Sequence, residues 1–399
     1  MSALQRAPLW EVAPAQPARV VRPRAGPVWS LGLEDIESGS GTISARNLVD
    51  PEELGSSTHA FTDAHVLYSK LRPNLNKVAL PDTAGWCTTE LLPLKPDPTR
   101  LDRAYLAHYL KSFAFVSWAT LRTDGAKMPR VKMDELRAHR IPLPSLLEQQ
   151  RIVTILDKAD AVRNRRREAV SLADDLLRSV FLNISHDIRD GTISGQIKNI
   201  GSLLSEGANP IRTGPFGSDL LHSEFTRHGV PVLGIDNIVT NRFRWTEPRC
   251  ISFEKYQTLK RFRVFPQDVI VTIMGTTGRV CVAPDDLPEC ISTKHLCVLT
   301  PNPSKVSSLY LWASLLFDPA VRKQTAQAGK GAIMEGWNMS IVRELEVAIP
   351  DSRTLERFDA TAKLIECLRT RNKALEFESE QLFGSLSSRA FNGEITAYQ

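Results

Sequence analysis

The feature that most constrains the fold is an internal duplication of the chain. Six short segments of the first half recur in the same order in the second half, 202 to 208 residues later. The matched pairs are 31–36 with 233–238, 65–69 with 268–272, Val78 with Val280, Thr89 with Thr293, 125–128 with 331–334, and 141–142 with 349–350. The 399 residues therefore form two copies of one unit of roughly 200 residues.

Each copy changes its hydrophobic pattern at an Ile-Pro pair. Before it, short β-branched runs such as "DVIVTIM" are broken by Gly, Pro, Asn and Asp, which predicts short strands in an irregular α+β globule. After it, apolar residues recur at steps of three and four, which predicts one long helix of about 54 Å in each copy. We therefore expect globules over 1–144 and 185–350, and helices over 145–184 and 351–399.

A long helix with one apolar stripe cannot bury that stripe against a small globule alone. We expect the two helices to pair antiparallel as a coiled coil that separates the two similar globules, with a pseudo-twofold axis relating the copies. The residues expected in this helix contact are Ile152, Ile155, Leu156, Val162, Leu176, Leu355, Phe358, Ile365, Leu368 and Leu375.

The charge balance gives a weak indication of the partner. Lys and Arg exceed Asp and Glu by 5, which favours an acidic partner such as nucleic acid. The basic runs at 163–168 and 369–373 are accompanied by a similar number of acidic residues along the same helices. We therefore interpret them as the solvated flank of a coiled coil rather than as a DNA contact.

Several classes of site and location are disfavoured. The six cysteines contain no C-x-x-C pair and the eight histidines lack ligand spacing, so we expect buried thiols and no metal site. Neither a signal sequence nor a run of 18 apolar residues is found, which predicts a cytoplasmic chain. The chain also lacks an Asn-Pro-Pro-Tyr or Asp-Pro-Pro-Tyr motif, a glycine-rich cofactor loop and a phosphate-binding P-loop, so we expect no catalytic residues in it.

Residues that could read DNA are basic and polar side chains on loops close to glycines. Arg and Lys suit guanine and phosphate, and Asn suits adenine. The candidates are Lys70, Arg72, Asn74, Lys77, Lys127, Arg130, Arg212, Thr213, Ser218, Arg242, Arg244, Thr276, Thr277, Arg279, Lys294 and Lys330. For each single Arg or Lys, a solvated surface charge is the alternative interpretation.

Several of these segments resemble one known family. The sequence "IPLPSLLEQQRIVTILDKADAVRNRRREAVSLADDLLRSVF" resembles the central conserved region of the specificity subunit of type I restriction-modification systems, and "IPDSRTLERFDATAKLIE" with "LFGSLSSRAFNGEI" resembles its distal conserved region. "IRTGPFGSDL", "GTTGRVCVAP" and "LYSKLRPNLNKVAL" resemble pieces of its target recognition domains. The resemblance covers almost the whole chain after about residue 30.

The resemblance implies a division of labour. Each globule would be a target recognition domain that binds one half of a split, asymmetric double-stranded DNA site. The helices would set the spacing and bind two methyltransferase subunits, which recruit the restriction and motor subunits. S-adenosylmethionine, ATP and Mg would then belong to those partner subunits, and this chain would need no cofactor.

Two departures and two alternatives accompany this resemblance. The second Ile-Pro segment has Glu356-Arg357 where the first has Glu148-Gln149, and the first globule has no counterpart of "RTGPFGS".

One alternative is a coiled-coil adaptor whose globules bind protein instead of DNA, which the basic loops disfavour. The other is a nuclease or methylase in its own right, which the missing motifs disfavour.

Overall fold

The structure is a computed structural model that describes residues 5–19, 21–23, 26–55, 57–207, 209–247, 249–328 and 337–394. Its contacts divide the chain into two units. Unit 1 comprises residues 1–168 and 373–399, and unit 2 comprises residues 169–372. Two long helices, α5 (Leu146–Arg189) and α11 (Ser352–Phe391), each contribute one part to unit 1 and the other part to unit 2.

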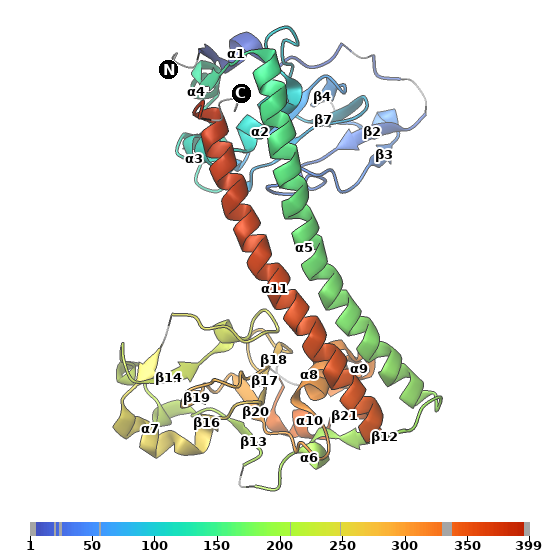
Figure 1. The fold of residues 1–399 in the computed structure, drawn as a ribbon, viewed down its shortest axis with the longest axis vertical. Helices are drawn as coiled ribbons and strands as arrows, with labels where there is room; N and C mark the ends of the chain where they lie inside the picture. The colour runs from blue at the N-terminus through green and yellow to red at the C-terminus, as the bar shows by residue number, and fades with distance from the viewer. Residues whose placement is uncertain are drawn as a thin grey trace. The chain divides into compact units, whose positions relative to one another are not determined.

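Unit 1 is an α+β globule with the N-terminal part of the chain, coloured blue to cyan in Figure 1. Its strands are β1 (Arg6–Pro8), β2 (Val28–Leu31), β3 (Asn47–Val49), β4 (Thr58–Phe61), β5 (Val66–Ser69), β6 (Val78–Ala79), β7 (Gly85–Thr88), β8 (Leu91–Leu94), β9 (Thr123–Asp124), β10 (Arg130–Val131) and β11 (Arg140–Pro142). Its shorter helices are α1 (Leu9–Val12), α2 (Arg103–Lys111), α3 (Phe113–Thr120) and α4 (Met133–Ala138).

Unit 2 is a second α+β globule with the same kinds of element. Its strands are β12 (Gly195–Asn199), β13 (Ile211–Thr213), β14 (Val230–Leu233), β15 (Cys250–Ile251), β16 (Arg263–Val264), β17 (Val269–Thr272), β18 (Val280–Val282), β19 (Cys290–Ser292), β20 (Leu296–Leu299) and β21 (Glu346–Pro350). Its shorter helices are α6 (Ile200–Leu203), α7 (Phe253–Leu259), α8 (Ser308–Phe317), α9 (Pro319–Ala328) and α10 (Met339–Glu344).

The two units share one sheet topology, as the duplication predicts. Unit 1 has a sheet of order β3-β2-β7-β4 and unit 2 one of order β15-β14-β19-β16. In each, one strand pair is parallel (β2 with β7, β14 with β19) and the others are antiparallel. The second sheets also agree, because β5 pairs with β6 and β8 as β17 pairs with β18 and β20.

The units differ where the sequence pattern differs. In unit 2, β13 carries the "IRT" of "IRTGPFGSDL" and extends the second sheet by pairing with β20. The described part of unit 1 has only the single bridge between Ala15 and Leu94 in this place. Conversely, unit 1 has a hairpin of β9 and β10, and its counterpart around 329–336 lies outside the described residues.

The two long helices run antiparallel within each unit. In unit 1, Arg163 contacts Glu380 and Arg167 contacts Glu376, so residue numbers rise on α5 as they fall on α11. In unit 2, Arg369 of α11 contacts Asp174 of α5 in the same sense. The helices pack as predicted, but charged side chains occupy much of the contact where an apolar stripe was expected.

This polar contact corrects part of the expected apolar set. Val162, Leu176 and Leu368 are 47%, 54% and 47% exposed, so they lie on the outside of the helix pair. The expectation failed because it assumed that a globule cannot cover its own helix. Ile152 and Leu156 in fact belong to the core of unit 1, together with Ala390 and Phe391 of α11.

The core of unit 2 takes up the other helix segments in the same way. Phe358 and Ile365, both predicted, are 1% and 4% exposed there. Phe358 packs edge-on against Tyr310 of α8, with ring centroids 5.0 Å apart. Ile155, Leu355 and Leu375 are half-buried. Because these helix segments are buried in the globules, each has a fixed position relative to the loops of its own unit.

Candidate nucleic-acid interfaces

In unit 1, two predicted segments come together on one surface. The connection between β5 and β6 carries Lys70, Arg72 and Asn74, and the β9–β10 hairpin carries Lys127 and Arg130. Backbone bonds join the two segments: the Arg72 N–H donates to the Pro129 carbonyl (2.7 Å) and the Val131 N–H donates to the Lys70 carbonyl (2.9 Å). These five side chains therefore form one polar, basic surface, which we call surface 1.

The backbone shape of surface 1 depends on two strained residues. Arg72 and Asn76 flank the short 3-10 helix Pro73–Leu75 and have φ of 48° and 49°. Asn tolerates this left-handed region, whereas Arg rarely adopts it, so the surrounding contacts must impose it. The Arg72 guanidinium donates to the Lys127 carbonyl at 3.5 Å, which links the two segments again.

Some of the charged side chains at surface 1 already have partners within the chain. Arg130 forms a bidentate pair with Glu90, with its nearest nitrogen 2.8 Å from a carboxylate oxygen. The hydrogen bond from Arg130 lowers the pKa of Glu90. The predicted Lys77 donates its ammonium to the Leu33 carbonyl at 2.6 Å and is half-buried, so it supports the loop instead of facing solvent.

In unit 2, predicted residues gather beside the ends of several strands. The turn between β17 and β18 carries Thr276, Thr277 and Arg279, and the turn after β19 carries Lys294 and His295. The Ile273 N–H donates to the His295 carbonyl at 2.9 Å, which joins the two turns. Arg279 and Lys294 are exposed, and we call this group surface 2.

Glycines allow the close backbone approach at surface 2. Gly275 and Gly278 have φ of 74° and 78°. A Cβ at Gly214, just after β13, would lie 1.9 Å from the Ser292 carbonyl oxygen. Only glycine therefore fits between β13 and the turn after β19. The predicted Ser218 is exposed in the following loop.

Three side chains predicted to contact DNA in unit 2 are instead buried in the fold or paired within it. Arg212 is 6% exposed and donates to Asp268, to the Arg263 carbonyl and to the Thr300 hydroxyl. Burial raises the pKa of Asp268, and the neighbouring Arg212 opposes that shift. Thr213 is 7% exposed. Since neither side chain can reach a ligand from the core, both predictions are wrong.

Arg242 is the third of these residues. Its guanidinium pairs with Asp174 of α5 (3.2 Å) and Glu366 of α11 (2.6 Å), and it lies over the Trp312 ring. The sequence could not show this contact because the three partners come from distant segments. Arg244 is exposed, donates to the Asp236 carbonyl, and stays a candidate, whereas Lys330 lies outside the described residues.

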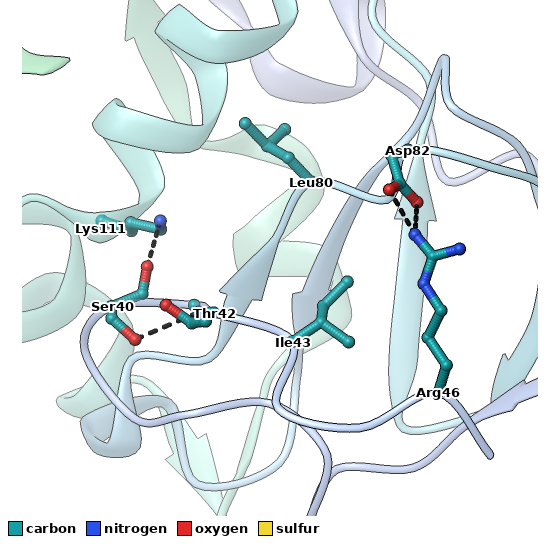
Figure 2. Close-up of a pocket in the computed structure, with 8 residues that line it drawn as sticks. Ser40, Thr42, Ile43, Arg46, Leu80, Asp82 and Lys111 are labelled. Atoms are coloured by element: carbon teal, nitrogen blue, oxygen red, sulfur yellow. Dashed lines mark hydrogen bonds and ion pairs between the residues drawn. The ribbon is translucent and has the colours of Figure 1, made fainter.

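One loop near surface 1 was missed by the sequence reasoning. Ser40, Thr42 and Arg46 line a cavity of about 310 Å³ with Leu80, Asp82 and Lys111, and Arg46 pairs with Asp82 (Figure 2). The Lys111 ammonium donates to the Ser40 carbonyl at 2.5 Å. The run "ESGSGT" at 37–42 signals this loop, since Gly and Ser clusters mark connections.

The described His, Cys, Asp and Glu side chains do not gather into a metal centre. Among them, no group of three or more His, Cys, Asp or Glu side chains could hold a metal ion. The cysteines Cys87, Cys250, Cys281, Cys290 and Cys297 are buried as predicted, whereas Cys367 is exposed. No helix within the described ranges is both long and apolar enough to cross a membrane. The chemistry that these surfaces offer is binding through hydrogen bonds and charge.

Comparison with known proteins agrees with this arrangement. A family model described as the type I restriction modification DNA specificity domain matches residues 61–171. The chain is 26% identical over 155 residues to the type I restriction enzyme EcoDI specificity subunit of Escherichia coli, a match that covers 38% of this chain and 34% of that relative. It is 21% identical over 345 residues to the EcoBI specificity subunit of Escherichia coli, covering 78% and 71% of the two chains.

A solved structure extends the likeness in fold to nearly the whole chain. The type I restriction-modification S subunit from M. genitalium superimposes with a TM-score of 0.59 and covers 97% of this chain and 96% of its own. Its sequence identity is 12%, so the likeness concerns the fold. The match with the EcoDI subunit, by contrast, spans about a third of that relative.

Proposed function

We propose that this chain is a type I restriction-modification specificity subunit and that it gives such a complex its DNA sequence specificity. The globules predicted at 1–144 and 185–350 are the target recognition domains, and each binds one half of a bipartite, asymmetric double-stranded site. The helices set the spacing between the half-sites. The chain itself is non-catalytic, while S-adenosylmethionine, ATP and Mg bind to the methyltransferase and restriction subunits.

The observation that carries this proposal is the repetition of one basic surface on one topology. In unit 1 the turn between β5 and β6 carries Lys70 and Arg72, and in unit 2 the turn between β17 and β18 carries Arg279. Glycines and polar side chains accompany both. Two equivalent surfaces with different residues suit a DNA site whose halves differ in sequence. Phosphate contacts position a protein on the duplex, and side chains at base edges determine which sequence it binds.

The surfaces for two methyltransferase subunits follow from a second repetition. Val162 and Leu176 of α5 lie 206 residues before Leu368 and Leu382 of α11, and all four side chains are 47% to 56% exposed. Unit 1 thus presents Val162 with Leu382, and unit 2 presents Leu176 with Leu368. Exposed aliphatic side chains at matched positions favour coverage by a protein partner. Two matched pairs support two copies of that partner.

A methyl-transfer assay tests the non-catalytic role. The purified chain is incubated with labelled S-adenosylmethionine and mixed-sequence DNA, with and without the partner methyltransferase. We expect no transfer by the chain alone and transfer at one bipartite site in the complex, since the sequence contains no Asn-Pro-Pro-Tyr or Asp-Pro-Pro-Tyr motif. Robust transfer by the chain alone would contradict the proposal, and so would a complex that methylates without sequence preference.

A second test concerns surface 2. Replacing Arg279 or Lys294 by Ala should weaken DNA binding by the complex and reduce the slope of log K against log salt by about one for each lost phosphate contact. Lys198→Ala, which removes another exposed cation, from β12, is the matched control and should leave both quantities unchanged. If all three variants behave alike, surface 2 is not the DNA contact.

A further inference from the structure

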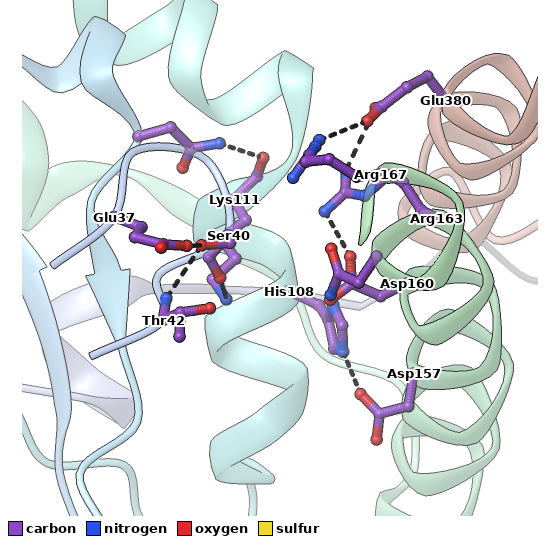
Figure 3. A network of polar contacts seen from close by, with 12 residues as sticks. Glu37, Ser40, Thr42, His108, Lys111, Asp157, Asp160, Arg163, Arg167 and Glu380 are labelled. Carbon is purple, nitrogen blue, oxygen red and sulfur yellow. Dashed lines mark hydrogen bonds and ion pairs between the residues drawn. The ribbon is translucent and has the colours of Figure 1, made fainter. Parts of the chain in front are cut away.

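The helix contact in unit 1 is organised around one arginine. Arg163 of α5 is 13% exposed in its side chain, pairs with Asp160 one turn earlier, and reaches Glu380 of α11 at 3.4 Å (Figure 3). Its guanidinium also lies 4.3 Å from the Phe383 ring centre. Arg167 strengthens the same contact by pairing with Glu380 at 2.9 Å. Four charges thus occupy the seam of two helices.

A cation from the globule joins this cluster. Lys111 of α2 donates to the Ser40 carbonyl and accepts, through its own carbonyl, the Asn76 side-chain amide at 3.0 Å. Burial lowers the pKa of Lys111, and the carboxylate of Asp160 acts against that shift. Lys111 therefore connects α2 with the loop at 37–42 and the loop at 72–77, and the charge of Asp160 on α5 favours its protonated form.

Unit 2 contains a cluster of the same design. Arg369 of α11 is 16% exposed and contacts Asp174 of α5 at 2.9 Å and Glu366 one turn earlier at 3.7 Å. Here the cation from the globule is Arg242, which pairs with both acids and stacks on Trp312 of α8. Arg242 follows the parallel strand β14, so it connects a loop beside surface 2 with the two helices.

The internal repeat relates the two clusters residue by residue. Asp160, Arg163 and Asp174 of α5 each lie 206 residues before Glu366, Arg369 and Glu380 of α11. In both units the arginine pairs with an acid one turn earlier and with an acid of the other helix. A globule cation also acts on the first acid, through its charge for Lys111 and by an ion pair for Arg242. The same charged arrangement occurs in both copies of the repeat, at positions where apolar side chains would pack. These charged residues therefore have a role other than adding buried apolar surface.

That role follows from the cost of an unpaired charge in the seam. In unit 1, sliding α11 by four residues in one direction would bring Gly384 opposite Arg163 and leave a largely buried guanidinium without an acid across the contact. In unit 2, sliding in the opposite direction would bring Ile365 opposite Asp174. Apolar contacts tolerate such slips, whereas a misplaced buried charge does not. Together, the two clusters therefore oppose a slip of α11 along α5 in either direction.

We propose that these clusters are positioning devices that set the helix register and thereby the length of the unspecified gap between the two DNA half-sites. Arg163 and Arg369 hold the register, and Arg242 ties a recognition loop of unit 2 to it without touching DNA. A slip of one helical turn is 5.4 Å, more than the rise of about 3.4 Å per base pair, so a lost register changes the gap measurably. This inference rests on the proposed function.

The test is methylome sequencing with the full chain and its partner methyltransferase. We expect the Arg163→Met, Arg369→Met double variant to keep the bases of both half-sites but to methylate sites with a gap altered by one or two base pairs at least tenfold more often than the unmodified chain. Arg163→Lys with Arg369→Lys keeps the charge and should retain one gap. Arg178→Met with Arg371→Met, two exposed helix positions, is the matched control.

Arg242→Gln separates positioning from DNA contact. We expect it to broaden the gap while leaving the bases of the second half-site and the salt dependence of binding unchanged. A changed base preference, or a salt slope lowered by about one, would assign Arg242 to DNA and overturn its role here.

Each remaining outcome also decides the question. If the double methionine variant keeps one gap, the inference is overturned. If circular dichroism shows that the double variant does not fold, the same outcome in either single methionine variant overturns it. If the unmodified chain itself directs methylation to no bipartite site, the proposed function fails instead, which distinguishes the two failures.

Discussion

At the scale of single residues, Gln149 shows how one polar side chain anchors a long helix. It is fully buried near the start of α5, accepts the Asp102 N–H at 2.7 Å, and donates to the Arg100 and Pro144 carbonyls at 2.8 Å and 2.9 Å. It thereby joins α5 to the N-terminus of α2. By the offset of 206 that relates the two helices, the matching position in unit 2 is the half-buried Leu355, and the Ser307 hydroxyl donates to Asp359 instead, at 2.6 Å.

The prediction at this scale concerns stability. Gln149→Ala should lower the free energy of unfolding of the full chain by about 2 to 4 kcal/mol, because it leaves buried backbone groups without partners. Gln150→Ala, its exposed neighbour, is the matched control and should change the free energy by less than about 0.5 kcal/mol. Urea unfolding followed by tryptophan fluorescence measures both. Equal effects would show that the buried bonds of Gln149 contribute nothing.

At the scale of elements, α5 and α11 combine two kinds of contact. Their outer turns bury apolar side chains in the globules, as Leu156 does in unit 1 and Phe358 in unit 2. Between these turns the helices meet through charged pairs such as Arg163 with Glu380. Removing 164–170 of α5 and 373–379 of α11 takes out Arg167 and Glu376 but keeps Arg163 with Glu380 in unit 1 and Asp174 with Arg369 in unit 2.

Deleting those two seven-residue segments should shorten the gap in the DNA site. Each deletion removes about 10 Å of helix rise, close to three base pairs. We expect both half-sites to keep their bases, since the recognition loops are unchanged. Methylome sequencing of a strain carrying the edited chain reads the result. Altered half-site bases with an unchanged gap would contradict the role of the helices as a spacer.

At the scale of the whole molecule, the duplication makes each half nearly self-sufficient. Residues 1–189 contain the first globule, all of α5, and both charge partners that the seam needs, Arg163 and Asp174. In a pair of identical fragments, Asp174 of one copy would take the place of Glu380 opposite Arg163 of the other. The counterparts of Ala390 and Phe391 would be Ile184 and Ser185, which fill the unit 1 core less well.

The fragment 1–189 should therefore form a twofold dimer in solution. Leaving the helix stripe in water costs roughly 25 cal/mol for each Å² of apolar surface, and a closed pair of identical chains removes that cost. With the methyltransferase partner, the dimer should mark a palindrome built from the first half-site and its inverted repeat. Light scattering and methylation mapping test both steps, with fragment 1–144 as the monomeric control. A stable monomeric 1–189 would contradict the prediction.

Several features of this fold can be predicted from the sequence alone. Repeats and hydrophobic periods are local properties of the chain, so the duplication, the two long helices and the α+β globules could be read directly. α5 begins at Leu146, close to the predicted 145, although it continues past 184 to Arg189. The pairing of Lys70 and Arg72 with the hairpin of Lys127 and Arg130 agrees with their separate selection as candidates.

Only the tertiary structure decided what each charged side chain does. Arg212 and Arg279 look alike in the sequence, yet one is buried against Asp268 and the other is exposed beside a glycine turn. Arg242 meets Asp174 and Glu366, which are 68 and 124 positions away in the chain. The free energy of a charge depends on its burial and on the partner within a few ångströms, and folding alone brings such distant partners together.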